Sequence, residues 1–230
     1  MLRSAFLLLA LTLGGCASLG AGGDAEPREL VVLVHGMGRS PLSMAALHVG
    51  LRREGYRTLN FGYNSFGPSI AEIADQLGAE LDGAMEDEPP SRVHFVTHSL
   101  GGIVVRQLLE TDRPDALGRV VMLAPPNGGS HEADKLAGWL GWMFRPMREL
   151  RTENSTVSRM APPRDVEVAV IAGDRDGKVS VEETRLEGAE HVVVRSAHTF
   201  IMTKPSVGRL VRCFLSTGEL GDCETEADGS

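Results

Sequence analysis

Aromatic side chains, cysteine and positive charge are scarce in this chain of 230 residues. Aromatic residues make up 5% of it, three cysteines are present, and 23 Lys and Arg stand against 31 Asp and Glu, giving a net charge of -8. This acidic balance argues against a nucleic-acid partner, because binding to phosphates needs a basic surface. The sequence has no internal repeat, and its hydrophobic content of 42% is enough for one globular domain with a real core.

Long apolar runs are also missing, except at residues 5–13. This run follows Arg3 and is too short to span a bilayer as a mature helix, so it predicts a secretory signal. The sequence Leu13-Gly14-Gly15-Cys16 resembles a bacterial lipobox, which is cleaved before a cysteine that then carries the lipid. We therefore expect a signal peptide at 1–15 and lipidation at Cys16, which would anchor the protein to a membrane without spanning it. An ordinary secretory signal with an incidental cysteine is the alternative.

Both ends of the mature chain are expected to lie outside the folded domain. Residues 16–29 are small, Gly-rich and polar, which predicts a flexible tether, and residues 219–230 form an acidic tail. Export would place the protein in the bacterial cell envelope, at the outer membrane or the periplasmic face, where conditions are oxidising. We expect Cys213 and Cys223 to form a disulfide there, and two free thiols are the alternative.

Residues 30–218 alternate short apolar strands with amphipathic helices. Strands are predicted at 30–34, 57–63, 93–96, 119–123, 166–172 and 191–195. One helix starts at Ser40 as its N-cap, another at the capping box Ser69-x-x-Glu72, and two more run to about residue 112 and over 205–215. This order predicts an α/β fold with a mostly parallel sheet covered by helices on both faces. In such sheets the functional loops lie at the carboxyl ends of the strands.

The most informative stretch is VHFVTHSLGGIVVRQLLE, residues 93–110. An apolar strand leads to Ser99, and apolar residues then recur at helical spacing. This layout is typical of a nucleophile elbow, which holds a serine hydroxyl in a tight turn between strand and helix. Gly101 stands where the chain must pass close to the strand it has just left. Thr97 stands where such motifs usually have a glycine, so the motif needs support from the rest of the chain.

A nucleophilic serine needs a base within hydrogen-bond reach, and the base needs an acid that fixes its tautomer. His198 is the predicted base, because it follows the last strand at the sheet end where the elbow opens. His98 is a poor candidate, since consecutive residues in the elbow point apart. Asp174 and Asp176 both follow the preceding strand and could serve as the acid. We favour Asp176, because it begins a turn that Val179 can anchor in the core.

Two further features would complete such a site. An oxyanion needs fixed N–H donors, and the backbone N–H groups of Met37 and Leu100 are the candidates. Residues 131–165 are too long for a plain connection and predict a helical cap. Its aromatic cluster includes Trp139, Trp142 and Phe144, which could line a substrate pocket or simply pack the cap onto the domain.

Five motifs together resemble the small bacterial lipase and esterase branch of the α/β-hydrolase superfamily: VVLVHGMGRS, VTHSLGG, MLAPPNGGS, DGKVS and AHTFIM. The resemblance covers most of residues 30–214. It implies an α/β-hydrolase fold with Ser99 as nucleophile, Asp176 as acid and His198 as base. It also implies Met37 and Leu100 as oxyanion donors, and no metal or organic cofactor.

The predicted activity is therefore cleavage of carboxylic esters, small or lipidic, through an acyl-enzyme intermediate. An acyltransferase or thioesterase using the same triad is the alternative, because the sequence does not show which molecule attacks the acyl-enzyme. A non-catalytic lipoprotein that uses the fold for binding is a third hypothesis. The joint presence of serine, aspartate and histidine counts against it.

Overall fold

The computed structural model describes residues 28–86, 88–131, 134, 145–152 and 156–221. Several predicted features lie outside these ranges: the signal peptide, Cys16, Cys223 and the predicted cap residues Trp139, Trp142 and Phe144. Cys213 is disulfide-bonded, which agrees with a bridge at this position, while the identity of its partner remains a prediction. Within the described ranges, no helix has both the length and the apolar character needed to cross a membrane.

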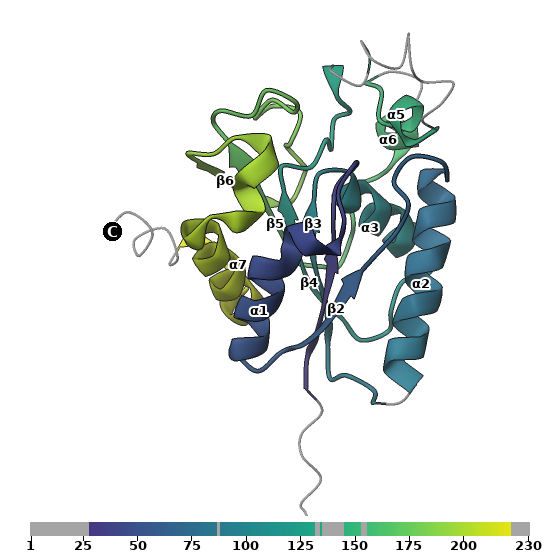
Figure 1. Cartoon of the computed structure of the whole chain (residues 1–230), viewed down its shortest axis with the longest axis vertical. Helices are drawn as coiled ribbons and strands as arrows, with labels where there is room; N and C mark the ends of the chain where they lie inside the picture. The colour runs from purple at the N-terminus through teal and green to yellow at the C-terminus, as the bar shows by residue number, and fades with distance from the viewer. Residues whose placement is uncertain (1–27, 87, 132–133, 135–144, 153–155, 222–230) are drawn as a thin grey trace, which may run out of the picture.

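A six-stranded sheet, parallel throughout, forms the centre of the domain (Figure 1). Its strands lie side by side in the order β2-β1-β3-β4-β5-β6. In chain order they are β1 (Leu30–Val34), β2 (Arg57–Phe61), β3 (Val93–His98), β4 (Leu117–Leu123), β5 (Val168–Gly173) and β6 (Glu190–Val194). β1, β3 and β5 are buried along their whole length, as expected for parallel strands covered on both faces. The predicted α/β fold with a parallel sheet is confirmed.

Helices cover both faces of the sheet, and each face has its own hydrophobic core (Figure 1). One face carries α1 (Ala45–Arg53) and α7 (Pro205–Thr217), and the other carries α2 (Ile70–Glu86) and α3 (Leu100–Thr111). The short helices α5 (Arg145–Glu149) and α6 (Thr156–Arg159) lie beyond the carboxyl ends of the strands, within the predicted cap region. The short 3-10 helices η1 (Pro41–Met44) and η2 (His198–Thr203) complete the domain.

The two predicted helix starts have different outcomes. The capping box before α2 is confirmed, because the Ser69 N–H donates to Glu72 Oε2 at 2.6 Å and the Glu72 N–H donates to Ser69 Oγ at 3.2 Å. Ser40 is at the predicted N-cap position, but the helix that follows it is the 3-10 helix η1. The Ser40 side chain makes no capping hydrogen bond, and the chain forms η1 before α1 begins at Ala45. Pro41 starts that 3-10 turn with its fixed φ and without needing an N–H acceptor.

The strand order places a topological switch point between β1 and β3. The connection after β1 leads to β2 on one side, whereas β3 and the later strands extend the sheet on the other side. The chain therefore leaves these two neighbouring strands toward opposite sides of the sheet, and open α/β sheets bind their ligands at the carboxyl ends of such strands. The loop 35–38 and the turn at Ser99 lie at these two strand ends.

Candidate active site

Ser99 occupies a strained turn between β3 and α3. Its backbone has φ 52° and ψ -123°, a conformation that a side-chain-bearing residue rarely adopts. Its N–H donates to the Leu123 carbonyl at 2.9 Å, which ties the turn to β4. A Cβ at position 101 would lie 2.4 Å from the Val34 carbonyl oxygen, so only glycine lets α3 start this close to β1. The elbow geometry predicted from the sequence is present.

Thr97 fits into the elbow because another glycine makes room for it. Its side chain is fully buried, and its Oγ1 lies 3.5 Å from the Val121 carbonyl oxygen. A Cβ at position 102 would lie 3.3 Å from Thr97 Oγ1, a closer approach than most side chains make. The space for the Thr97 side chain therefore comes from the missing side chain at Gly102. In the sequence, the second glycine of Leu100-Gly101-Gly102 indicates this space.

Three side chains from three strand ends form a continuous hydrogen-bonded chain. His198 Nε2 lies 3.0 Å from Ser99 Oγ, and His198 Nδ1 lies 2.6 Å from Asp176 Oδ2. A carboxylate only accepts hydrogen bonds, so the proton of a neutral His198 is on Nδ1. The lone pair of Nε2 then faces the serine hydroxyl, as a general base requires.

The structure separates the two candidate acids. Only 1% of the Asp176 side chain is exposed, and its Oδ1 accepts the N–H groups of Lys178 at 2.8 Å and Val179 at 2.9 Å. Asp174 is exposed, and its Oδ1 accepts the Ser196 N–H at 3.1 Å. Asp176 is thus the carboxylate that orients His198, while Asp174 ties two loops together.

The loop after β1 closes over Ser99 from the other side. A Cβ at position 36 would lie 3.1 Å from Ser99 Cβ, so the loop approaches the serine as closely as a glycine allows. Gly38, at φ 66°, donates its N–H to Ser65 Oγ at 2.8 Å, which fixes the loop. In the part of the chain that the structure describes, the Met37 N–H donates no hydrogen bond. Leu100 is the first residue of α3, where a helix leaves N–H groups without an internal acceptor.

Comparison with known proteins places this fold and site in one family. A profile of the alpha/beta hydrolase family matches residues 31–212, which is more than half of the chain. The chain belongs to the α/β-hydrolase family. The family and the hydrogen-bonded site together support a hydrolase.

Solved structures share the fold of this α/β hydrolase at low sequence identity. The mature lipase BlEst2 of Bacillus licheniformis is 20% identical with a TM-score of 0.68, over 86% of this chain and 94% of that chain. Phospholipase PlaB of Legionella pneumophila is 17% identical with a TM-score of 0.68, over 87% of this chain and 62% of that one. An esterase of Thermogutta terrifontis is 16% identical with a TM-score of 0.65, over 84% and 91% of the two chains. No curated protein matches the sequence.

His98 is a residue of the hydrolase site that the sequence analysis set aside. It is a poor base, but its ring lies 4.9 Å from the His198 ring, and its Nε2 lies 3.0 Å from the His198 carbonyl oxygen. A carbonyl oxygen accepts only, so the proton of His98 is on Nε2. Burial, reinforced by the neighbouring His198, lowers the pKa of His98 to about 3. His98 therefore stays neutral and holds the backbone of the predicted base.

Tyr63 is a second such residue, and it supports the loop that carries Met37. Its hydroxyl donates to the His35 carbonyl at 2.7 Å, and its ring stacks on the His35 imidazole with centroids 4.3 Å apart. Burial raises the pKa of Tyr63 and lowers that of His35. No local sequence pattern predicts the contact between Tyr63 and His35, because it depends on the end of β2 lying beside the end of β1.

Metal ligation has no candidate among these residues. Across the described ranges, no group of three or more His, Cys, Asp or Glu side chains could hold a metal ion.

Proposed function

We propose that this α/β hydrolase cleaves carboxylic esters through an acyl-enzyme formed on Ser99. The observation that carries the proposal is the chain of hydrogen bonds from Asp176 through His198 to Ser99, with the serine held in a strained turn. In each of these hydrogen bonds the donor and the acceptor are the ones that nucleophilic catalysis requires. The solved structures with this fold include a lipase and an esterase, which is consistent with ester substrates.

The proposed mechanism follows from the donor and acceptor roles in this hydrogen-bonded chain. Ser99 Oγ attacks the ester carbonyl carbon while His198 Nε2 takes the hydroxyl proton, and Asp176 stabilises the resulting imidazolium. The negative carbonyl oxygen is placed between the N–H groups of Met37 and Leu100, which are fixed before the reaction starts. Collapse of the intermediate breaks the ester C–O bond, and His198 returns the proton to the departing alcohol. Water then attacks the acyl carbon while His198 takes its proton, the bond from that carbon to Ser99 Oγ breaks, and His198 returns the proton to Ser99 as the carboxylic acid leaves.

The second acyl acceptor distinguishes the proposed esterase from an acyltransferase, and the leaving group distinguishes it from a thioesterase. All three would use the same triad. A lipidic ester is the substrate class that a lipid anchor at Cys16 would bring close, and Trp139, Trp142 and Phe144 are the predicted acyl-binding residues. A protein that only binds its ligand has no need of a serine in a strained turn opposite a tautomer-fixed histidine.

Labelling with a fluorophosphonate probe tests the proposal. Wild type and Ser216→Ala, which removes an exposed serine hydroxyl far along α7, should be labelled equally, whereas Ser99→Ala should not be labelled. Labelled enzyme should lose turnover of p-nitrophenyl esters, and a series of acyl chain lengths would define the acyl pocket. Absence of labelling and of ester turnover in folded wild type would refute the proposal. A matched thioester and an added acceptor alcohol distinguish the two alternative activities.

A further inference from the structure

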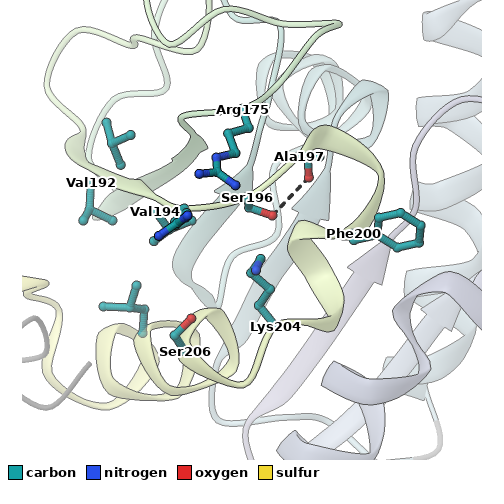
Figure 2. Close-up of a pocket in the computed structure, with 11 residues that line it drawn as sticks. Arg175, Val192, Val194, Ser196, Ala197, Phe200, Lys204 and Ser206 are labelled. Atoms are coloured by element: carbon teal, nitrogen blue, oxygen red, sulfur yellow. Dashed lines mark hydrogen bonds between the residues drawn. The ribbon is translucent and has the colours of Figure 1, made fainter. Parts of the chain in front are cut away.

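An open groove follows the free edge of β6 and lies outside the triad. β6 is the last strand of the sheet, and among the residues that the structure describes it pairs only with β5. Residues 192–197 all line the groove on this side, and parts of η2 and α7 line the other side (Figure 2). The groove has a volume of about 730 Å³, which is in the range of small-molecule sites.

Cationic side chains converge in this groove, and none of the residues that line it is an aspartate or a glutamate. Arg175 and Lys204 point toward each other from opposite sides, with Ser196 between them (Figure 2), and Arg195 also lines the groove. Over the described ranges, none of these three cations takes part in an ion pair. Oδ1 of Asp174, the carboxylate beside Arg175 in sequence, is bound to the Ser196 N–H. Converging like charges repel, so an anion between them would be favourable.

Apolar side chains line much of the rest of the groove. Val192 and Val194 of β6 line it together with Leu210 of α7. At its margins Val193 is 46% exposed and Phe200 is 62% exposed, which are high values for large hydrophobic side chains. A ligand that neutralises the cations and also covers the valines needs a charged head and a hydrocarbon chain.

We propose that this groove binds an amphiphilic anion: one alkyl or acyl chain that ends in a carboxylate or a phosphate. The head group would lie between Arg175 and Lys204, and Ser206 also lines this groove. Charge-assisted hydrogen bonds to guanidinium and ammonium groups are the strong ones. The chain would lie along Val192 and Val194.

The groove shares its walls with the loops that hold the triad, although no triad residue lines it. The Arg175 N–H donates to the Ser196 carbonyl at 3.1 Å, so the loop of Asp176 and the segment before His198 are joined at the groove. The proposal concerns binding alone and does not depend on ester cleavage by Ser99.

Calorimetric titration of the full chain, below the micelle concentration of each ligand, tests the binding. The probes are dodecyl phosphate, dodecanoate, inorganic phosphate and dodecyltrimethylammonium. Both amphiphilic anions should bind, with an affinity that falls as salt is added, because salt screens exposed charges. The alkylammonium should not bind measurably, and inorganic phosphate should bind at least about tenfold more weakly, since burying each methylene group contributes to affinity. Equal binding of the alkylammonium or of inorganic phosphate would overturn the proposal.

Substitutions locate the ligand. Arg175→Gln and Lys204→Gln should each weaken dodecyl phosphate about five- to tenfold, as expected for loss of one charge-assisted hydrogen bond in a partly open site. Arg53→Gln, which removes an exposed cation from α1, should change the affinity by less than about twofold. Equal loss in all three variants would show nonspecific charge attraction, and no loss in the first two would place the ligand elsewhere. Either result would refute the groove as the site, and thermal melts check that each variant is folded.

Discussion

Replacing Asp176 by asparagine would reverse the proton positions in the triad with little change in shape. Oδ1 of residue 176 accepts two N–H groups, from Lys178 and Val179, at 2.8 and 2.9 Å. These donors hold an asparagine with its oxygen toward them, because its amide nitrogen cannot accept a hydrogen bond. The amide nitrogen must then face His198 Nδ1, where a carboxylate oxygen now lies at 2.6 Å.

Two donors cannot face each other, so the ring of His198 would move its proton to Nε2. That proton would stand between Nε2 and Ser99 Oγ, which are 3.0 Å apart, and the base would lose its free lone pair. A carboxylate-to-amide change of this kind in a serine triad lowers kcat by about 10⁴-fold, which corresponds to roughly 5.5 kcal/mol of transition-state stabilisation. The two backbone hydrogen bonds remain, so the free energy of unfolding should change by no more than about 1–2 kcal/mol.

The assay is kcat for a short-chain p-nitrophenyl ester in Asp176→Asn and in Asp174→Asn as the matched control. Asp174 is exposed and touches the Ser196 N–H instead of His198, so the control should keep its activity within about fivefold of wild type. Urea unfolding of both variants separates loss of chemistry from loss of fold. A large loss in Asp174→Asn together with a small one in Asp176→Asn would show that the tautomer argument is wrong.

Three further changes test the support of the site. Gly101→Ala should destabilise the fold by several kcal/mol and abolish activity, because its Cβ would lie 2.4 Å from the backbone oxygen of Val34; in urea unfolding Gly83→Ala, with nothing within 4 Å, should be neutral or slightly stabilising. The pKa of about 3 for His98 in the folded state lies below its value near 6.5 in the unfolded state, so between these pH values only the unfolded state binds the proton. The free energy of unfolding therefore decreases as the pH is lowered through this window. The contribution lost at pH 5 is about 2 kcal/mol, and a His98→Gln variant should lose this part of the difference in unfolding free energy between pH 7 and pH 5. Tyr63→Phe removes the donor to the His35 carbonyl at 2.7 Å and should lower the unfolding free energy by about 1–3 kcal/mol; an unchanged value would show that this bond does not hold the loop.

The predicted site residues lie together because each follows a strand in a parallel sheet. Ser99, Asp176 and His198 follow β3, β5 and β6, and the carboxyl ends of parallel strands share one edge. The apolar runs that predict these strands are strong local signals, and they place the residues at that edge before any contact is known. The choice between Asp174 and Asp176 depended on a local turn, which the hydrogen bonds to Oδ1 now display.

Contacts between side chains from distant segments were beyond reach of the same reasoning. The sequence places His98 beside Ser99, but it does not show the His198 carbonyl that the His98 ring contacts. At Ser40 the local preference for an N-cap was real, yet the following 3-10 turn left the hydroxyl unused for capping. In both positions the direction of a side chain depends on packing that no short pattern contains.

Two glycines near the site allow a close approach between segments that are distant in the chain. Gly36 lies in the loop after β1, and Gly101 lies two residues after Ser99. Each would clash with the other's segment if it had a Cβ: a Cβ at 36 would lie 2.8 Å from His98 Nδ1, and one at 101 would lie 2.4 Å from the Val34 oxygen. These reciprocal clashes exist only because β1 and β3 are neighbours in the sheet, although β2 separates them in the chain. The lack of a side chain at these two positions therefore lets the ends of β1 and β3 lie this close together. The same adjacency places the loop that carries Met37 next to the turn that carries Ser99 and Leu100.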